Sequence, residues 1–489
     1  MSESIAEMVI PGTYIEVRAE GLIGVGGIST GNVGVVGSAA KGPVNTPMLL
    51  GSYADALDVF GAYDSAIQSS TPGPSPGDPP VPGPVPLTLT RAVEQAFLGG
   101  ASTVIAVRAA NGTVVKATRV LKDGAADAFT LTAKEGGTWG NQMKIGVVAG
   151  DTAGTFKLAL TFANVTETYT GTPAAIQAAI QAESRLVDAS ATPTTATGLT
   201  AIDPPTAFGT ATGTGNALGN DQSSLTAIEF KAGLAALVDQ PVNIVLVANG
   251  TATLDLKGVV GAHLEETENQ GRERIAVLGA GNPGSATDVS PVTAETATVA
   301  NDRIILVAPG VVYTDPGTGK PHNLPPSYLA AAVAGKLAAQ APHVSLTNKA
   351  LDVDGVSVVY GAPATKTLLG ARVLVVRPKF GFQVVKGITT DNGAFRQISV
   401  RRTIDFAKAG VRLGADPYIG RLNNARVRAA LKATLDGFLS QMVLDEMLVE
   451  YELAVTATRA QEIAGICAVA MTLKPTFSID YIRVTMTLQ

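Results

Sequence analysis

Five short runs rich in Val and Ile, each apolar on both faces, recur along the first two thirds of the chain. They begin at Asn32, Thr103, Val242, Arg274 and Arg303 and read NVGVVGSA, TVIAVRAA, VNIVLVANG, RIAVLGAG and RIILVAPG. Such runs are typical of parallel strands in a sheet that helices cover on both sides. Segments with helical spacing lie between and after them, among them TRAVEQAFLGG, AIEFKAGLAALVDQ and PSYLAAAVAGKLAAQA. The alternation predicts a doubly wound α/β domain.

Two segments interrupt this alternation. Residues 70–86 read STPGPSPGDPPVPGPVP, and prolines cannot donate to a β-ladder, so we expect an exposed polyproline-like loop. Residues 112–216 change to short strands, AFTLTAK, MKIGVVAG, FKLALTF and ETYTG, and end in a solvated loop rich in Thr and Ala. We therefore expect an inserted, mainly β domain at 112–216 within an α/β domain formed by 31–111 and 217–350.

The pattern of predicted strands and helices changes again after residue 350. SVVYG, ARVLVVRPKFGFQVVKGITT and LVEYELAVTA resemble strands, and GRLNNARVRAALKATLDGFLSQMVLD between them resembles a helix. In that helix one apolar stripe at helical spacing is formed by Val427, Leu431, Leu435, Phe438 and Met442. We expect an α+β domain over 351–476, which makes the whole chain a multidomain α/β plus β protein.

Both terminal segments alternate between apolar and polar residues, as half-buried strands do. At the start, Ile15 and Val17 alternate with Tyr14, and from Ile482 onward the apolar positions are Ile482, Val484, Met486 and Leu488. We expect strand arms at 1–30, with a linker, and at 477–489. Each arm can pair within its own chain or with another molecule, and the pattern alone favours the first because most terminal strands are intramolecular.

Composition narrows the possible partners and location. The net charge is −5 and no basic tract is present, so we expect no nucleic-acid partner. No apolar run approaches 18 residues, so we expect no direct membrane insertion. MSESIAEM lacks the features of a signal peptide, so we expect assembly in a bacterial cytoplasm. The single cysteine, Cys467, is expected in a core.

The sequence contains no recognisable catalytic or metal-binding motif. The three histidines, His263, His322 and His343, have no neighbour at ligand spacing. GTGKP lacks the first half of a phosphate loop, and VGVVGSAAKGP has one glycine where a dinucleotide loop needs three. We predict no catalytic residue, no metal, no cofactor and no enzyme activity. Doubly wound sheets often bind ligands at their strand ends, so a ligand-binding protein or enzyme without a known motif is the alternative.

Several stretches, in the same order along nearly the whole chain, resemble the contractile tail sheath family of phage tails, R-type bacteriocins and contractile injection systems. They are IPGTYIEV, GNVGVVGSAAKGPVNTPMLLGSYADALDVFG, AFLGGASTVIAVR, EGGTWGNQMKIGV, LPPSYLAAAVAG and VVKGITTDNGAFRQISVRRTIDF. The chain departs from the family pattern in the proline-rich segment 70–86 and in KLAAQAPHVSLTNKAL, which follows Gly335.

The resemblance implies a structural subunit that forms stacked hexameric rings, a helical homopolymer, around an inner tube protein. It also implies baseplate and terminator or cap proteins as partners, and contraction that drives the tube through a target envelope. In such a particle both terminal arms, including Tyr14, Ile15, Val17 and Ile482–Leu488, add strands to a neighbouring copy, which reverses the preference for intramolecular pairing. The glycines of EGLIGVGGISTG would supply a flexible root for the first arm.

The resemblance further implies that the 351–476 domain faces the tube while the middle and inserted domains lie outside. Arg421, Arg426 and Arg428, near the start of the predicted helix, are then candidates for ion pairs with the tube or a neighbour. The alternative is an ordinary solvated helix end, because exposed ion pairs contribute little. A sheath recycled by an ATPase would also need an exposed recognition helix, and no clear one is visible.

Overall fold

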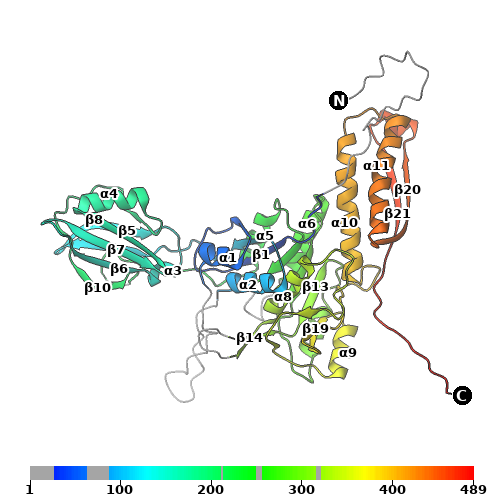
Figure 1. Ribbon diagram of the computed structural model, residues 1–489, viewed down its shortest axis with the longest axis horizontal. Coiled ribbons are helices and arrows are strands. Elements are labelled where there is room, and N and C mark those ends of the chain that lie inside the picture. The colour runs from blue at the N-terminus through cyan, green and yellow to red at the C-terminus, as the bar shows by residue number, and fades with distance from the viewer. Residues whose placement is uncertain (1–26, 63–86, 211–212, 249–255, 315–320, 489) are drawn as a thin grey trace, which may run out of the picture. The chain divides into compact units, whose positions relative to one another are not determined.

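A computed structural model describes residues 27–62, 87–210, 213–248, 256–314 and 321–488 (Figure 1). By internal contacts the chain divides into two compact units. The α/β unit comprises Thr30–Ala341 and Ser345–Ile398. The C-terminal unit comprises Ser399–Gln489 with Pro342–Val344 and the first residues up to Ser29.

A nine-stranded sheet forms the centre of the α/β unit, in the order β16-β19-β18-β13-β12-β11-β1-β3-β2. Its parallel strands are β1 (Val33–Gly37), β3 (Val104–Arg108), β11 (Ile244–Val247), β12 (Ile275–Gly279), β13 (Ile304–Ala308) and β18 (Leu374–Pro378). Antiparallel strands complete both edges: β2 (Pro47–Leu50), β19 (Phe382–Val384) and β16 (Ala350–Leu351). All five runs predicted as parallel strands are confirmed.

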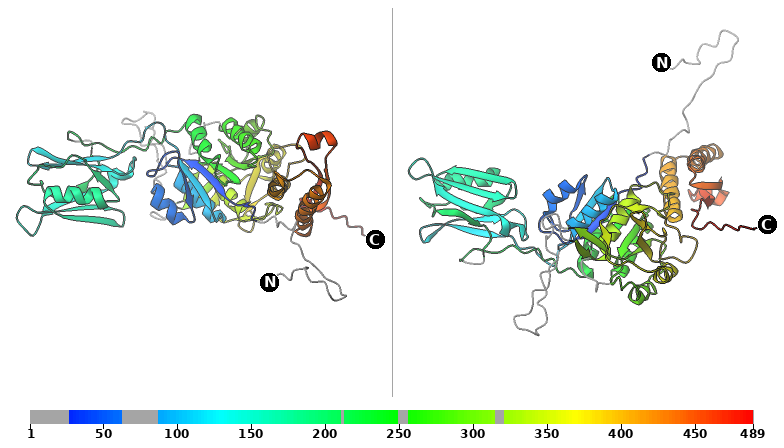
Figure 2. Two further views of the ribbon diagram at one scale, coloured as in Figure 1. Left: turned by 90° about the horizontal axis from the view of Figure 1, so that it is seen from above. Right: turned by 60° about the horizontal axis from the view of Figure 1, so that its bottom comes forward.

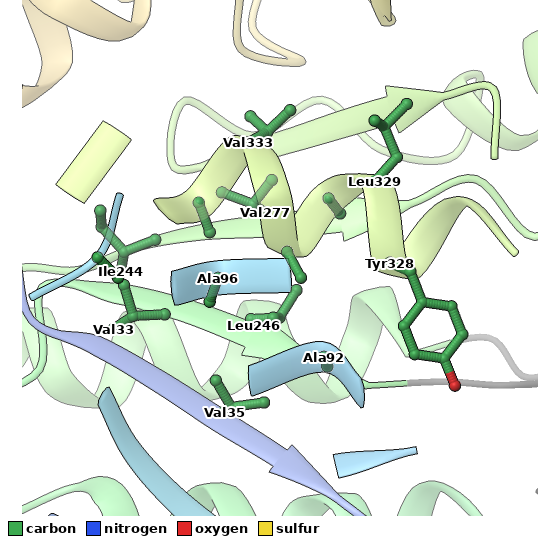
Figure 3. Close-up of a cluster of buried hydrophobic side chains, with 14 of the residues drawn as sticks. Val33, Val35, Ala92, Ala96, Ile244, Leu246, Val277, Tyr328, Leu329 and Val333 are labelled. Atoms are coloured by element: carbon green, nitrogen blue, oxygen red, sulfur yellow. The ribbon is translucent and has the colours of Figure 1, made fainter. Parts of the chain in front are cut away.

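Helices cover both faces of this sheet. One face packs against α1 (Tyr53–Phe60), α2 (Leu89–Gly99) and α8 (Pro326–Ala338). The other packs against α5 (Ala227–Leu237), α6 (Lys257–Asn269), α7 (Ser290–Thr296) and α9 (Ala362–Gly370). Figure 3 shows residues of α2 and α8 lying over apolar side chains of β1, β11 and β12. The two helices pack so closely that a Cβ on Gly335 would lie 2.0 Å from the Ala96 carbonyl oxygen. The doubly wound prediction is thus confirmed.

The expected domain start at residue 351 is not where the compact units separate. Strands β16, β18 and β19, between residues 350 and 384, extend the nine-stranded sheet, and contacts assign 345–398 to the α/β unit. Leu374, Val375 and Val376 are all buried, which is the same two-faced apolar pattern as in the five earlier runs. SVVYG, predicted as a strand, is not one. It follows β17 (Gly355–Val356), which pairs with β14 (Val311–Thr314), itself paired with β15 (Pro321–Leu324).

Residues 112–216 hold two antiparallel sheets around one apolar core (Figure 2). One sheet contains β4 (Thr118–Asp123), β5 (Ala126–Ala133) and β9 (Val187–Ala189). The other contains β10 (Ile202–Ala207), β6 (Lys144–Ala149), β7 (Phe156–Phe162) and β8 (Val165–Gly171). Two helices, α3 (Trp139–Gln142) and α4 (Pro173–Glu183), complete the segment. The sequence pattern predicts a loop where β10 lies. The prolines of β10 are tolerated because it is an edge strand of its sheet.

The C-terminal unit consists of two long helices and a β-hairpin (Figure 1). The helices are α10 (Ile398–Ala415) and α11 (Ala425–Leu444), linked by the 3-10 turn Asp416–Tyr418. The hairpin strands are β20 (Leu448–Thr456) and β21 (Ala468–Pro475), and α12 (Arg459–Ile463) lies between them. The predicted apolar stripe is confirmed: Leu431, Leu435, Phe438 and Met442 are buried and Val427 is half-buried.

Candidate functional site

The β20–β21 hairpin is a two-stranded sheet whose outer edges are open. The strands pair along their length, from Glu450 with Lys474 to Thr456 with Ala468, and no other strand of the described chain pairs with either. An isolated hairpin is marginally stable in water, and open edges are templates for further strands. This sheet therefore has two vacant positions for added strands.

Helix packing holds the hairpin in place without covering its edges. The side chains of Tyr451, Leu453 and Leu473 pack into the core that α10 and α11 form. Tyr451 also fixes β20 to α11, because its hydroxyl lies 2.7 Å from the Ser440 hydroxyl and donates to the Asp436 carboxylate at 2.7 Å. The edges are thus presented on a rigid support, which favours strand addition over fraying.

The segment after β21 is exposed and belongs to no strand among the described residues. Its apolar side chains are 72–98% exposed at the four predicted positions, Ile482, Val484, Met486 and Leu488. The strand predicted here from the alternation is therefore not formed within this chain, because no ladder in the described chain accepts it. Exposure of so many large apolar side chains in one segment is typical of an interaction surface.

The predicted N-terminal arm residues Tyr14, Ile15 and Val17 lie outside the described residues. The described chain starts at the end of the glycine-rich stretch that was predicted as a flexible root. Gly27 has a φ of +83°, which favours glycine, and Ile28 packs against the core of the C-terminal unit. The described part of this stretch is thus attached, through Ile28, to the unit that carries the open hairpin.

The three candidate arginines differ in their surroundings. Arg428 is engaged within the chain, since it donates to the Glu462 carboxylate at 2.9 Å and to the Asn423 side chain at 3.0 Å. Hydrogen bonds from Arg459 and from Arg428 hold the pKa of Glu462 below its usual value. Arg421 is exposed, lies over the Tyr418 ring at 5.4 Å and donates to the Pro417 carbonyl; Arg426 is also exposed.

The EGGTWGNQ motif forms the root that joins residues 112–216 to the rest of the α/β unit. Arg108, at the end of β3, is fully buried and donates to the carbonyl oxygens of Gly42 and Gly136 at 2.8 Å. Its guanidinium lies 3.6 Å from Asp221, in the segment that returns from residues 112–216 to α5. Asp221 in turn accepts hydrogen bonds from the backbone and hydroxyl of Thr138. Burial lowers the pKa of Arg108, although Asp221 opposes that shift.

The other motif residues explain why this root is closely packed. A Cβ on Gly137 would lie 1.9 Å from the Ala40 carbonyl oxygen, and Gly137 has a φ of +135°, so only glycine fits. Asn141 forms reciprocal hydrogen bonds with the backbone of Gly219 at 2.7 and 2.9 Å. Trp139 is buried, with Lys41 over its ring at 5.3 Å. The motif thus has a structural role in joining two parts of the unit.

The strand ends where doubly wound sheets often bind ligands are closely packed here. Thr88, just before α2, donates to the Ala248 carbonyl at 2.8 Å and is hydrogen-bonded to Ser38 after β1. A Cβ on Gly37 would lie 2.8 Å from the Thr88 hydroxyl. Among the described residues no cluster of His, Cys, Asp or Glu could hold a metal ion. No helix in the described part of the chain could span a membrane.

Comparisons with known proteins agree with the C-terminal architecture. Residues 390–489 match the family model of the phage tail sheath C-terminal domain. A tail sheath protein of Mycobacterium phage Bxz1 is 26% identical over 251 residues, which cover 49% of this chain and 43% of that protein. The aligned region thus spans less than half the length of this curated relative.

Solved structures share the fold over nearly the whole chain. A sheath tail protein from Desulfitobacterium hafniense is 19% identical with a TM-score of 0.64, covering 95% of this chain and 100% of that chain. One from Listeria innocua is 16% identical with a TM-score of 0.63, covering 92% and 93%. A contracted sheath of an extracellular contractile injection system, PVC, is 13% identical with a TM-score of 0.56, covering 98% and 97%.

Sequence reasoning identified the terminal segments that could act as strand donors but not their acceptor. LVEYELAVTA was predicted as a strand, yet nothing in its alternation shows that its outer edge stays open. Exposed apolar residues at the far end of the hairpin were also missed, namely Ile419, Leu422, Ile463 and Ile466. Their only sequence signal is isolated Ile and Leu among Gly, Asn and Arg, which is a weak one.

Proposed function

Because residues 390–489 match the family model of the phage tail sheath C-terminal domain, we propose that this chain is the sheath subunit of a contractile phage tail or tail-like particle. The family resemblance read from the sequence is confirmed, and the shared fold over nearly the whole chain agrees with it. The open hairpin is the main support for the proposal. One subunit presents vacant β-edges together with an exposed alternating segment, and strand addition between copies would join such subunits into a polymer.

In this proposal the subunits form stacked hexameric rings around an inner tube, with a baseplate at one end and a terminator or cap at the other. Assembly takes place in the bacterial cytoplasm, without nucleic acid or membrane insertion. Contraction moves the subunits between two discrete packed arrangements. Many subunits move together, so each needs to gain only a few kcal/mol from added contacts, and no nucleotide hydrolysis is required.

Terminal strands link the copies. Residues 482–488 of one copy and the segment around Tyr14, Ile15 and Val17 of another each add to one edge of a β20–β21 hairpin. The alternating apolar side chains then become buried on one face, while backbone hydrogen bonds fill both ladders. A continuous chain held in this way remains attached while the packed units rotate, which side-chain contacts alone would not allow.

The proposal also includes an inward and an outward part of the subunit, as the family resemblance implies. The C-terminal unit faces the tube, with Arg421 and Arg426 in contact with it or with a neighbour. Arg428 has a supporting role within the chain, since Glu462 already binds it. Residues 112–216 form the outer domain, joined to the α/β unit through the Arg108–Asp221 root.

Deletion of residues 482–489 tests the strand donation. We expect folded monomers that fail to form cylinders, because one edge of each hairpin would stay vacant. Val484→Pro should act in the same way, since proline cannot donate to the ladder, whereas Val484→Ala keeps the backbone N–H. The readouts are negative-stain electron microscopy for hollow cylinders and circular dichroism for folding.

Two outcomes would refute parts of this proposal. Normal cylinders from the deletion variant would eliminate the arm assignment. Dispersed monomers from the unaltered chain under all assembly conditions would favour the alternative, a ligand-binding α/β protein, over a sheath.

A further inference from the structure

Helix α11 carries charges at both ends that oppose its own dipole. Arg426 and Arg428 lie in its first turn, where the helix dipole is positive. Asp445 caps its last turn, where the dipole is negative, and Glu446 follows directly. Twenty residues separate the two groups by about 30 Å, so they do not compensate each other. Within one copy both groups oppose the dipole, and at the first end the Arg428–Glu462 ion pair offsets part of this cost.

The first end of α11 belongs to a basic and apolar surface, which we call the basic end and define as residues 416–428 and 459–466. Its two segments are joined by the Arg428–Glu462 ion pair and by the Asn423 amide, which donates to the Ile466 carbonyl at 2.9 Å. Four arginines outnumber its two carboxylates, Asp416 and Glu462. Its large apolar side chains are 52–79% exposed: Ile419, Leu422, Ile463 and Ile466.

The other end is acidic and apolar. This acidic end comprises residues 444–452, at the turn from α11 into β20, together with Lys474 opposite it. It holds four carboxylates, Asp445, Glu446, Glu450 and Glu452, against that one lysine, which pairs with Glu450 at 2.8 Å. Leu444 and Val449 are 76% and 54% exposed. Both ends therefore combine exposed apolar side chains with an excess of one charge.

We propose that the basic end of one copy docks on the acidic end of a second copy, so that C-terminal units stack head to tail. This inference rests on the proposed function and names the residues of one contact in the polymer. Opposite charges and aligned helix dipoles make the contact favourable where each end alone is unfavourable. The apolar side chains supply the buried centre, and the charges supply orientation.

A second copy fits both surfaces better than another partner does, because the two ends complement each other. A contact that joins two different surfaces of the same chain can repeat from copy to copy, and it generates a helical filament where its rotation does not close into a ring. A C-terminal unit with two matching ends at opposite poles of α11 meets that requirement. The open hairpin edges are left available for the arms, so the two kinds of contact can coexist.

Charge reversal provides a sharp test. One variant carries Arg421→Glu and Arg426→Glu, which makes both ends acidic. The other carries Asp445→Lys and Glu446→Lys, which makes both ends basic. Each variant alone should repel itself and raise the protein concentration needed for cylinders by about tenfold or more, measured by pelleting and electron microscopy.

Mixing the two variants in equal amounts should restore cylinders, because each end then meets a neighbour of opposite charge. The quadruple variant should also assemble, since both signs are reversed together. A matched control, Lys144→Glu with Lys157→Glu on exposed positions of β6 and β7, should assemble as the unaltered chain does. Circular dichroism and thermal melting confirm that each monomer is folded.

The outcomes separate this inference from the proposed function. If the unaltered chain forms cylinders and either reversed variant assembles equally well, the head-to-tail contact is refuted while the sheath proposal stands. If both variants fail and neither the mixture nor the quadruple variant recovers, the charge pairing is also refuted. Absence of cylinders from the unaltered chain would overturn the sheath proposal and this inference with it.

Discussion

At the scale of single residues, a buried His–Arg pair shows how the α/β unit accommodates a buried cation. Arg274, just before β12, is 1% exposed and donates to the carbonyl oxygens of Leu237, Val238 and Gln240 at the end of α5. Its other terminal nitrogen lies 3.0 Å from Nε2 of His263, which must therefore accept as neutral imidazole. Burial and the neighbouring cation lower the pKa of His263 to about 4.

This depressed pKa predicts a loss of stability in acid. Above pH 6.5 His263 is neutral in both the folded and the unfolded chain, so it does not lower the free energy of unfolding. As the pH falls from 6.5 to about 4, the unfolded chain binds a proton and the folded chain does not. This lowers the free energy of unfolding by about 3 kcal/mol. His263→Gln should flatten this part of the curve of unfolding free energy against pH.

Carboxylates also titrate in that range, so the test compares the pH slopes of variants with that of the unaltered chain. His322→Gln, at a half-buried position on β15, is the matched control and should keep the slope of the unaltered chain. Unfolding free energy is measured by urea titration between pH 4 and 6.5. If its slope against pH is the same for His263→Gln and the unaltered chain, the His263–Arg274 pair does not cause the loss of stability in acid.

At the scale of elements, the sequence was informative where periodicity alone decides the structure. The five doubly apolar runs and the stripe on α11 could be predicted because burial dictates residue type at each position. The placement of residues 351–398 could not, because strand pattern does not tell which sheet a strand joins. The open edges of β20 and β21 also escaped prediction, since an edge strand and a central strand can share one alternation.

The junction between α3 and the segment around Asp221 depends on one buried ion pair. Asp221→Ala would leave the fully buried Arg108 cation without its carboxylate and would remove the acceptor of the Thr138 backbone and hydroxyl. Loss of one partner of a buried pair is expected to cost about 3 kcal/mol of unfolding free energy. Thermal melting and limited proteolysis around residues 112–116 and 217–224 would measure the loss.

A control at an exposed ion pair separates burial from charge. Asp188→Ala removes the carboxylate that binds Lys134, where the side chains are 50% and 35% exposed. An exposed pair contributes about 1 kcal/mol or less, so this variant should melt close to the unaltered chain. Similar losses for the two variants would contradict a special role of the buried joint.

At the scale of the whole molecule, the two units differ in how much of their stability they hold alone. The nine-stranded sheet of the α/β unit is covered on both faces by large apolar cores. The C-terminal unit has two small cores and a two-stranded sheet that is packed on its helices and has no further strand in the described chain. Assembly should therefore stabilise the C-terminal unit far more than the α/β unit.

Amide hydrogen exchange on monomers and cylinders of the same chain would show this difference. In monomers, amides at the open edges of β20 and β21 and in residues 477–488 should exchange quickly, because no ladder in the described chain protects them. In cylinders the same amides should slow by orders of magnitude once donated strands fill both edges, while β1, β11 and β12 change little. Unchanged exchange in the hairpin and in 477–488 upon assembly would mean that the strands are not donated, whatever the cylinders look like.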